Sequence, residues 1–235
     1  MSATTTLAVI SAGAAKGLVS ALQDDFAAAQ GAAIDGAFGA VGSMKEKLLA
    51  GAPCDVVILT AAMIAELERD GRTVPGTAAP LGRVRTGIAV RAGAALPPID
   101  DRGALLRLLR AATSLYVPDT VRSTAGLHVV KVLRELGIEG EVAPRLKPFP
   151  NGAAAMREMA LATDAAPVGC TQVTEILYTP GVTLAGALPA EFELATVYSV
   201  AVSATARQPD LARRFAQRLA GDDAAELRRA GGFEP

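Results

Sequence analysis

The chain has 235 residues, of which 51% are apolar, and its 23 basic and 24 acidic residues give a net charge of −1. This length and composition support a sizeable hydrophobic core, in one large domain or two smaller lobes. The basic residues form no stripe and no aromatic platform accompanies them, which argues against a nucleic-acid partner. No run of 18 uncharged apolar residues predicts a membrane span.

The chain begins with a pattern typical of an anion-binding turn. The apolar segment 7–10 predicts a buried strand, 11–14 is a turn of small residues, and 16–29 has a helical pattern. A strand that leads into the N-terminus of a helix presents backbone N–H groups to an anion. Residues 1–6 lack the basic and apolar regions of a secretory signal. We therefore expect a cytoplasmic protein, or a periplasmic one if a signal peptide has been removed.

Strand and helix patterns alternate along the rest of the chain, which favours an α/β fold with mostly parallel strands. Strands are expected at 34–38, 55–59, 84–91, 115–117, 167–170 and 197–203. Helices are expected at 43–49, 61–70, 102–112, 124–136, 153–162, 209–219 and 224–230.

A break near Gly93 and a returning strand near Val197 indicate two lobes. The first lobe would contain residues 1–88 and 198–235, and the second residues 89–197. Ligands of open α/β sheets bind at the carboxyl ends of the strands. We therefore expect a hinge and an interlobe cleft that holds the ligand.

Cys54 and Cys170 are the only cysteines. We expect both to be reduced, with a disulfide as the alternative. Cys170 is interpreted as a buried structural thiol rather than a nucleophile. The chain has one histidine and no zinc-ligand spacing, so we predict no metal site and no cofactor.

Two turns of the first lobe are candidate anion sites. The Ser11 hydroxyl and the N–H groups around Gly13 would receive a carboxylate, and Lys16 in the first helical turn could reach the same anion. The alternatives are a tight turn that requires small residues and a solvated lysine. In the second turn, Gly42 allows close backbone approach, and Ser43 either contacts the ligand or caps the helix that follows.

The second lobe offers another candidate site. Ser123 and Thr124 lie at an expected helix N-terminus, where hydroxyl and free amide groups can bind an anion. Arg122 would bind a carboxylate through two hydrogen bonds, or it is a surface arginine. Asp119 in the same loop would cap or turn the chain. Gln172 can both donate and accept hydrogen bonds to a ligand.

Two residues are candidates to move a proton. Glu175, partly desolvated and near ligand carboxylates, would have a raised pKa that suits a general base. Alternatively, Glu175 stabilises the first turn of a helix through its charge. His128 lies one turn into the helix after Ser123 and could approach the cleft as a proton carrier, or it is a half-buried structural histidine.

The order and spacing of several segments resemble a known family over almost the whole chain. Besides the opening strand and turn, they are Leu-Ala-Gly-Ala-Pro-Cys-Asp-Val-Val-Ile-Leu at 49–59, Thr-Gly-Ile-Ala-Val-Arg-Ala-Gly at 86–93, Ser-Thr-Ala-Gly at 123–126, Gln-Val-Thr-Glu at 172–175, 180–189 and a Gly-Phe at 232–233. With these segments the chain is similar to the molybdate-binding-like group of solute receptors, which have a type II periplasmic-binding-protein fold.

The resemblance also implies a difference in ligand. Receptors of this group carry hydroxyl side chains in the first two anion loops and a tyrosine late in the second lobe. The corresponding positions here are Ala14, Val41 and Gln172, so we do not expect a tetrahedral-oxyanion pocket. The Gln-x-x-Glu and Pro-Gly-Val segments instead resemble a divergent branch associated with aconitate isomerase.

That branch implies a cytoplasmic isomerase that shifts the double bond of an unsaturated di- or tricarboxylate by an allylic proton transfer. This chemistry requires no metal or cofactor, and the partner is a small-molecule anion. One alternative is a non-catalytic solute-binding protein of an ABC transporter for molybdate or another oxyanion, which would have a transporter partner. The other is an intracellular anion sensor.

Overall fold

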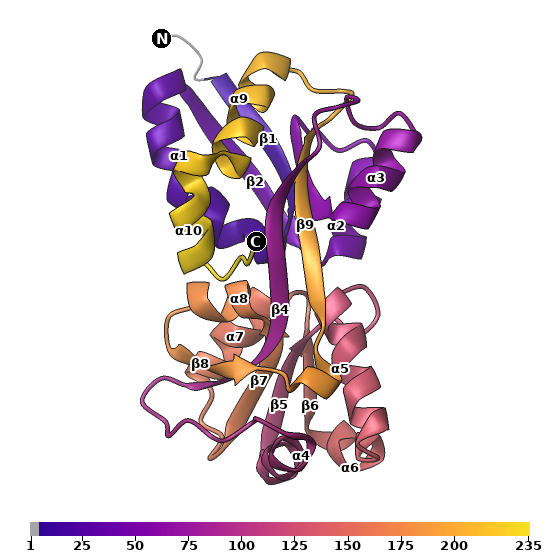
Figure 1. Ribbon diagram of the computed structural model, residues 1–235, viewed down its shortest axis with the longest axis vertical. Coiled ribbons are helices and arrows are strands. Elements are labelled where there is room, and N and C mark those ends of the chain that lie inside the picture. Colours follow the sequence, from indigo (N-terminus) through magenta and orange to yellow (C-terminus); the bar gives the residue numbers. More distant parts are fainter. Residues whose placement is uncertain (1–4) are drawn as a thin grey trace. The chain divides into compact units, whose positions relative to one another are not determined.

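A computed structural model describes residues 5–235. The chain divides into two compact units. Unit 1 contains the residues up to Arg83 together with Thr196–Pro235, and unit 2 contains Val84–Ala195. The chain passes between the units within β4 (Ala79–Arg91) and at the start of β9 (Ala195–Val202) (Figure 1). Both transitions lie slightly earlier in the chain than the expected 88/89 and 197/198.

The sheet of unit 1 has the strand order β2-β1-β3-β9. β1 (Thr5–Ala12) is parallel to β2 (Ala32–Gly39) and to β3 (Val56–Thr60), whereas β9 is antiparallel to β3. Four successive side chains of β3, from Val56 onward, have no exposed surface, so both faces of the sheet are covered. The covering helices are α1 (Lys16–Gln30), α2 (Val41–Leu49), α3 (Ala61–Arg69) and α9 (Pro209–Ala220).

Asp55, just before β3, connects three segments of unit 1. Its buried carboxylate accepts hydrogen bonds from the backbone N–H groups of Ala8 in β1 (2.8 Å), and of Arg207 (2.6 Å) and Gln208 (3.0 Å) at the start of α9. An acidic group at a helix N-terminus satisfies N–H groups that have no helical acceptor. Asp55 therefore links the sheet to the C-terminal helices.

The sheet of unit 2 is mixed. β5 (Ser114–Pro118) lies between the parallel strands β6 (Leu146–Phe149) and β7 (Pro167–Gln172), and β4 is antiparallel to both β7 and β8 (Val182–Ala187). The expectation of mostly parallel strands is therefore only partly correct. The α/β class is confirmed, but the sequence patterns did not predict β6 or β8.

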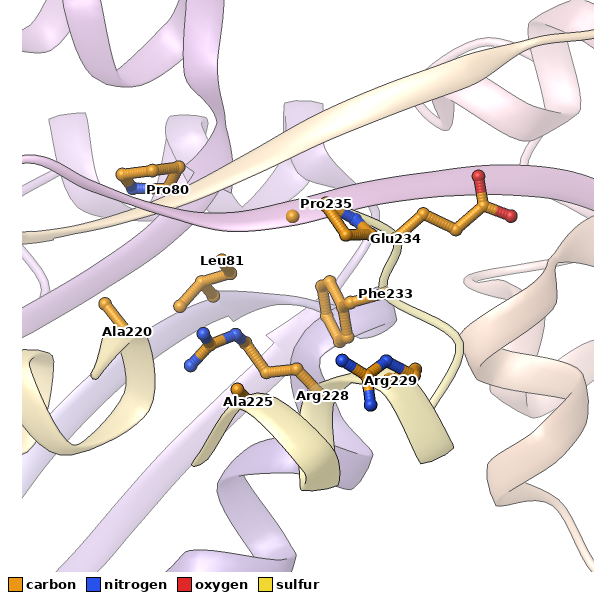
Figure 2. A pocket seen from close by; sticks show the side chains of 10 residues that line it. Pro80, Leu81, Ala220, Ala225, Arg228, Arg229, Phe233, Glu234 and Pro235 are labelled. Atoms are coloured by element: carbon orange, nitrogen blue, oxygen red, sulfur yellow. The ribbon is translucent and has the colours of Figure 1, made fainter. Parts of the chain in front are cut away.

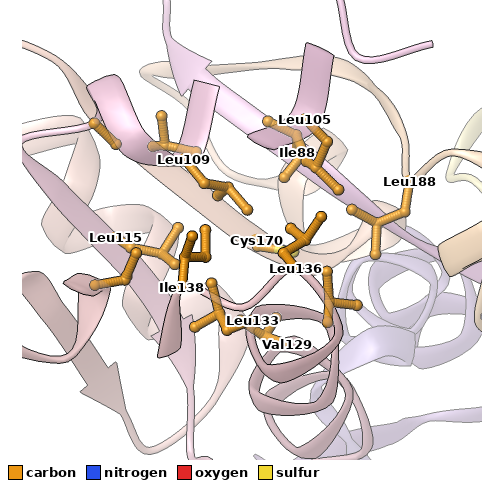
Figure 3. Close-up of a cluster of buried hydrophobic side chains, with 14 of the residues drawn as sticks. Ile88, Leu105, Leu109, Leu115, Val129, Leu133, Leu136, Ile138, Cys170 and Leu188 are labelled. Carbon is orange, nitrogen blue, oxygen red and sulfur yellow. The ribbon is translucent and has the colours of Figure 1, made fainter. Parts of the chain in front are cut away.

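Helices cover both faces of the unit 2 sheet. On one face, α4 (Arg102–Ala111), α5 (Thr124–Glu135) and the short α6 (Glu139–Val142) form a core with alternate strand residues. Figure 3 shows this core, which includes Ile88, Leu105, Leu109, Leu115, Val129, Leu133 and Cys170. On the other face, α7 (Gly152–Leu161) and α8 (Val173–Tyr178) pack on β4 and β5 through Met156, Met159 and Ile176. In unit 1 the last helix is α10 (Ala225–Ala230).

Candidate functional site

In unit 1, the three parallel strands end at the same edge of the sheet, which we call its carboxyl edge. Ala12 of β1 pairs with Gly39 of β2, and Ser11 pairs with Ile58 of β3. Each strand leads into a helix within one or a few residues. Three helical N-termini therefore lie along this edge. The first N–H groups of each have no carbonyl acceptor within their own helix.

The predicted turn after β1 lies at this edge, but its hydroxyl is already bonded. β1 extends through Ala12, and the turn is a short 3-10 helix at Gly13–Ala15. Ser11 is fully buried in β1, and its hydroxyl donates to the Ala12 carbonyl (2.9 Å). Lys16 is half-buried with its ammonium 5.8 Å from the centre of the Phe38 ring. The backbone N–H groups, rather than the Ser11 hydroxyl, are thus the groups available to an anion here.

The second predicted turn begins its helix earlier than expected. α2 starts at Val41 with Ala40 as the N-cap residue, so Ser43 does not cap the helix, and that alternative was wrong. The physical reason is that Met44 N–H already donates to the Ala40 carbonyl (3.0 Å), which closes the first helical turn ahead of Ser43. Gly42 and Ser43 are both half-buried in that turn.

Unit 2 has a corresponding carboxyl edge. β5, β6 and β7 are parallel, Pro118 pairs with Phe149, and the three strands lead into α5, α7 and α8. Ser123 caps α5, since its hydroxyl accepts from Gly126 N–H at 3.4 Å, and Thr124 is the first helical residue. The predicted helix start is therefore confirmed.

The loop before α5 is held by Asp119. Its carboxylate accepts from the N–H groups of Val121 (2.7 Å) and Arg122 (2.9 Å), and these bonds lower the pKa of Asp119. The expectation that Asp119 turns the chain is confirmed. The Arg122 side chain is exposed.

Glu175 lies at the N-terminus of α7 as well as in the first turn of its own helix, α8. Its buried carboxylate accepts from the Thr171 hydroxyl (2.6 Å) and from Ala153 N–H (3.3 Å). Burial raises the pKa of Glu175, while these hydrogen bonds act in the opposite direction. A Cβ at Gly152 would lie 2.0 Å from Glu175 Oε2, so only glycine allows the carboxylate to approach α7 this closely.

His128 is half-buried in α5, and its Nε2 lies 2.7 Å from the Phe192 carbonyl oxygen. Because a carbonyl can only accept, this nitrogen carries the proton. The contact supports the structural interpretation of His128, since it holds one face of α5 against the segment before β9.

Gln172 ends β7 and is the most informative polar residue of unit 2. Its side chain is 3% exposed, and neither amide atom has a hydrogen-bond partner among residues 5–235. Directly opposite on β4 lies Thr86, which is 1% exposed and whose hydroxyl is also unpartnered within the described chain. Buried polar groups are nearly always hydrogen-bonded, so two such neighbours require an explanation.

The backbone geometry places these two side chains close together. The N–H and C=O groups of Thr86 bond to Leu194 and Leu188, away from β7. Thr86 and Gln172 are therefore a non-hydrogen-bonded antiparallel pair, in which side chains approach closely. Thr86 was not predicted as a site residue, although it begins the segment 86–93 that contributes to the family resemblance.

Both side chains lie on the face of the sheet that α5 covers. Side chains alternate along a strand, so Thr86 and Gln172 share a face with Ile88 and Cys170, which belong to the core formed with α4 and α5. α5 begins at the same carboxyl edge at which β7 ends with Gln172. The amide of Gln172, the hydroxyl of Thr86 and the first N–H groups of α5 are thus brought to one edge and one face.

The two cysteine thiols are buried and unreactive near neutral pH. Cys54 and Cys170 are free and buried, as expected, and burial raises the pKa of each thiol to about 12. Neither forms a thiolate near neutral pH, which is the form that acts as a nucleophile.

A cavity of about 290 Å³ in unit 1 lies apart from the predicted residues. It lies between the start of β4, α10 and the last residues of the chain, as Figure 2 shows. Arg228 in its wall donates to the carbonyls of Leu219 (2.7 Å) and Gly221 (2.8 Å), and Arg229 pairs with Glu226. Both guanidinium groups therefore have partners within unit 1.

Metal-binding clusters and membrane-spanning helices are both absent from residues 5–235. No group of three or more His, Cys, Asp or Glu side chains there is arranged to hold a metal ion. No helix in the same range combines the length and apolar character needed to cross a bilayer.

Residues 7–234 match the family described as bacterial extracellular solute-binding protein. The chain belongs to this family. An aconitate isomerase of Pseudomonas sp is 28% identical over 242 aligned positions, which cover 98% of this chain and 88% of the relative.

Solved structures agree with the fold of this solute-binding family. The periplasmic molybdate-binding protein of Azotobacter vinelandii superposes with a TM-score of 0.78 at 19% identity, over 97% of this chain and 99% of that one. The sulfate-binding protein of Mycobacterium tuberculosis superposes with a TM-score of 0.73 at 20% identity, over 98% and 87%. The resemblance to molybdate-binding-like receptors with a type II periplasmic-binding-protein fold is therefore confirmed.

Proposed function

We propose that this solute-binding protein binds a small carboxylate anion and shifts the double bond of an unsaturated di- or tricarboxylate. The observation that carries the proposal is the full-length similarity to an aconitate isomerase. The buried, unpartnered amide of Gln172 at the carboxyl edge of unit 2 supports it, because an amide can recognise a carboxyl group by donating and accepting hydrogen bonds.

The proposed ligand contacts are the residues expected from the sequence. In unit 1 they are Ser11, Gly13, Lys16, Gly42 and Ser43, where backbone N–H groups at the carboxyl edge would bind one carboxylate. In unit 2 they are Arg122, Ser123, Thr124 and Gln172.

The reaction needs one base and a set of hydrogen-bond donors. The base removes a proton from the allylic carbon, the electron pair moves through the double bond to the conjugated carboxyl group, and a dienolate forms. The N–H groups of helix N-termini would stabilise its negative charge. The proton then returns to the far carbon of the allylic unit, so the double bond has moved and no atom is gained or lost.

Glu175 is the better supported of the two proposed bases. Its pKa is raised by burial, which brings a carboxyl group closer to the range in which it exchanges protons at working pH. The Nε2 of His128 already donates to the Phe192 carbonyl, so only its other nitrogen would remain for proton transfer.

Proton NMR in heavy water tests this activity. We expect cis-aconitate incubated with the protein to convert to a mixture with trans-aconitate and to take up deuterium at the allylic carbon. Glu175→Gln should lower the rate by at least about 100-fold, the usual range for loss of a general base. Glu158→Gln, an exposed glutamate of α7, is the matched control and should leave the rate unchanged. Unchanged substrate without deuterium would overturn the enzymatic proposal.

A non-catalytic receptor is the second candidate. The family match and the fold shared with a periplasmic molybdate-binding protein favour it, and it would act outside the cytoplasm with a transporter as partner. Calorimetric titration with molybdate and sulfate separates the two candidates. Tight binding of either anion together with no change in aconitate would favour the receptor.

A further inference from the structure

The pairing of Thr86 with Gln172 carries an inference about the chemical form of the ligand, which rests on the proposed function. Three polar atoms lie unpartnered in this pair: the amide nitrogen and oxygen of Gln172 and the hydroxyl oxygen of Thr86. Their side chains are 3% and 1% exposed, so bulk water does not readily satisfy them. Leaving a buried polar group unpaired is unfavourable, and a matching ligand would remove this penalty.

The Thr86 hydroxyl and the Gln172 oxygen are not hydrogen-bonded to each other, and in this arrangement a fully deprotonated anion cannot satisfy all three atoms. The Gln172 nitrogen and the Thr86 hydroxyl can donate to two oxygens of an anion, but the Gln172 oxygen can only accept. Against an anion with no hydrogen, that carbonyl oxygen would face negative oxygens and remain unpaired. A ligand group that carries an O–H beside another oxygen would complete the set.

The apolar side chains around Thr86 and Gln172 also favour a ligand group that carries an O–H. The pair shares a face of the sheet with Ile88 and Cys170, in the apolar core under α4 and α5. Cys170 lies two residues before Gln172 in β7, so it is the neighbouring side chain on the same face, and it is also buried. The first N–H groups of α5 at the same edge would bind a charged group of the ligand, whereas the apolar side chains beside Thr86 and Gln172 disfavour an ionised carboxylate relative to its protonated form.

We propose that Thr86 and Gln172 together bind an O–H group of the anionic ligand, with Gln172 Oε1 as the acceptor of its hydrogen. In a polycarboxylate this O–H belongs either to an alcohol or to one carboxyl group held in its protonated form. A protonated carboxyl would also assist the proposed reaction, because the negative charge left when the allylic proton is removed then spreads into a neutral group rather than into a carboxylate that is already charged.

Calorimetry with two tricarboxylates distinguishes the two sources of the O–H. Citrate and tricarballylate have the same carbon skeleton, and only citrate carries an alcohol. If the alcohol is bound, citrate should bind about tenfold or more tightly at pH 7.5, which corresponds to about 1.4 kcal/mol. If a protonated carboxyl is bound, tricarballylate should bind with uptake of about one proton, measured from its heats in two buffers of different ionisation enthalpy.

Variants assign the effect to this pair. Gln172→Met removes the acceptor and the donor at similar length, and Thr86→Val removes only the hydroxyl. Either should abolish the preference for citrate or the proton uptake. Thr73→Val is the matched control, because Thr73 is equally buried and equally unpartnered within the described chain but lies in unit 1, next to the residue after β9. It should leave both quantities unchanged.

The outcomes separate this inference from the proposed function. Equal binding of both acids by the wild-type protein without proton uptake would overturn the inference and leave carboxylate binding intact. The same effects persisting in both variants would also overturn the assignment to this pair. Absence of binding to any carboxylate would remove the proposed function, and this inference with it.

Discussion

Because Glu175 packs against Gly152, we expect Gly152→Ala to destabilise the protein, whereas helix propensity alone would predict a gain in stability. Gly152 is the first residue of α7, where replacing glycine with alanine normally stabilises a helix by up to about 1 kcal/mol. In this structure a Cβ at Gly152 would lie 1.9 Å from Thr171 Oγ1 and 2.0 Å from Glu175 Oε2, well inside any real contact. Gly152→Ala must therefore displace the Glu175 carboxylate.

The expected cost can be estimated from what is displaced. Overpacking a buried position costs about 1–3 kcal/mol. Losing the Thr171 hydroxyl and Ala153 N–H as donors to a buried carboxylate adds about 1.5–3 kcal/mol. After the propensity gain is subtracted, we expect Gly152→Ala to destabilise the protein by about 3 kcal/mol. A chain of this length should then melt about 6–12 °C lower.

Thermal and urea unfolding measure this change. The matched control is Gly140→Ala in α6, where a Cβ would have no heavy atom within 4 Å and the backbone is helical. That substitution should leave stability unchanged or raise it slightly. A Gly152→Ala protein as stable as the wild type would refute the placement of the Glu175 carboxylate against α7.

Three further predictions concern single side chains. Burial raises the pKa of Glu175 above its ordinary 4.5, so the contribution of this group to folding stability is complete below that pH and is lost as the pH rises through the folded pKa. Urea titrations should therefore show Glu175→Gln gaining stability relative to the wild type as the pH rises from about 4 to 8. A stability difference that does not change with pH would contradict this. Ser123→Ala should lower the free energy of unfolding by about 1 kcal/mol through loss of the α5 cap, whereas Ser123→Asp should retain most of it. Asp55→Asn places an amide donor against one of three backbone N–H groups and should lower the free energy of unfolding by about 2–3 kcal/mol, measured by urea unfolding. A decrease of less than about 0.5 kcal/mol would contradict the role of Asp55.

Elements with a strong local pattern were predictable from the sequence. The strand expected at 55–59 corresponds to β3 (Val56–Thr60), which is buried on both faces, and the polar loop before Thr124 caps α5 through Ser123. The residues that identify each element lie within a few positions of one another, although β3 itself pairs with the distant strands β1 and β9. Local chemistry was therefore sufficient to place these elements.

Elements and contacts that depend on distant residues were not predictable. β6 is four residues long and contains Pro148, so it has neither alternation nor length to identify it as a strand. Thr86 gains its significance only because the register of β4 and β7 places it opposite Gln172, 86 positions later in the chain. Likewise, Glu175 acts at the N-terminus of α7 because the fold brings Ala153 to it.

A crystal structure of the protein soaked with cis-aconitate would show directly where the ligand binds. We expect a carboxyl group of the ligand within hydrogen-bond distance of Gln172 and the first N–H groups of α5, at the carboxyl edge of the unit 2 sheet. Ligand density elsewhere, or a tetrahedral oxyanion that binds in place of the carboxylate and leaves the Gln172 amide unpartnered, would contradict it.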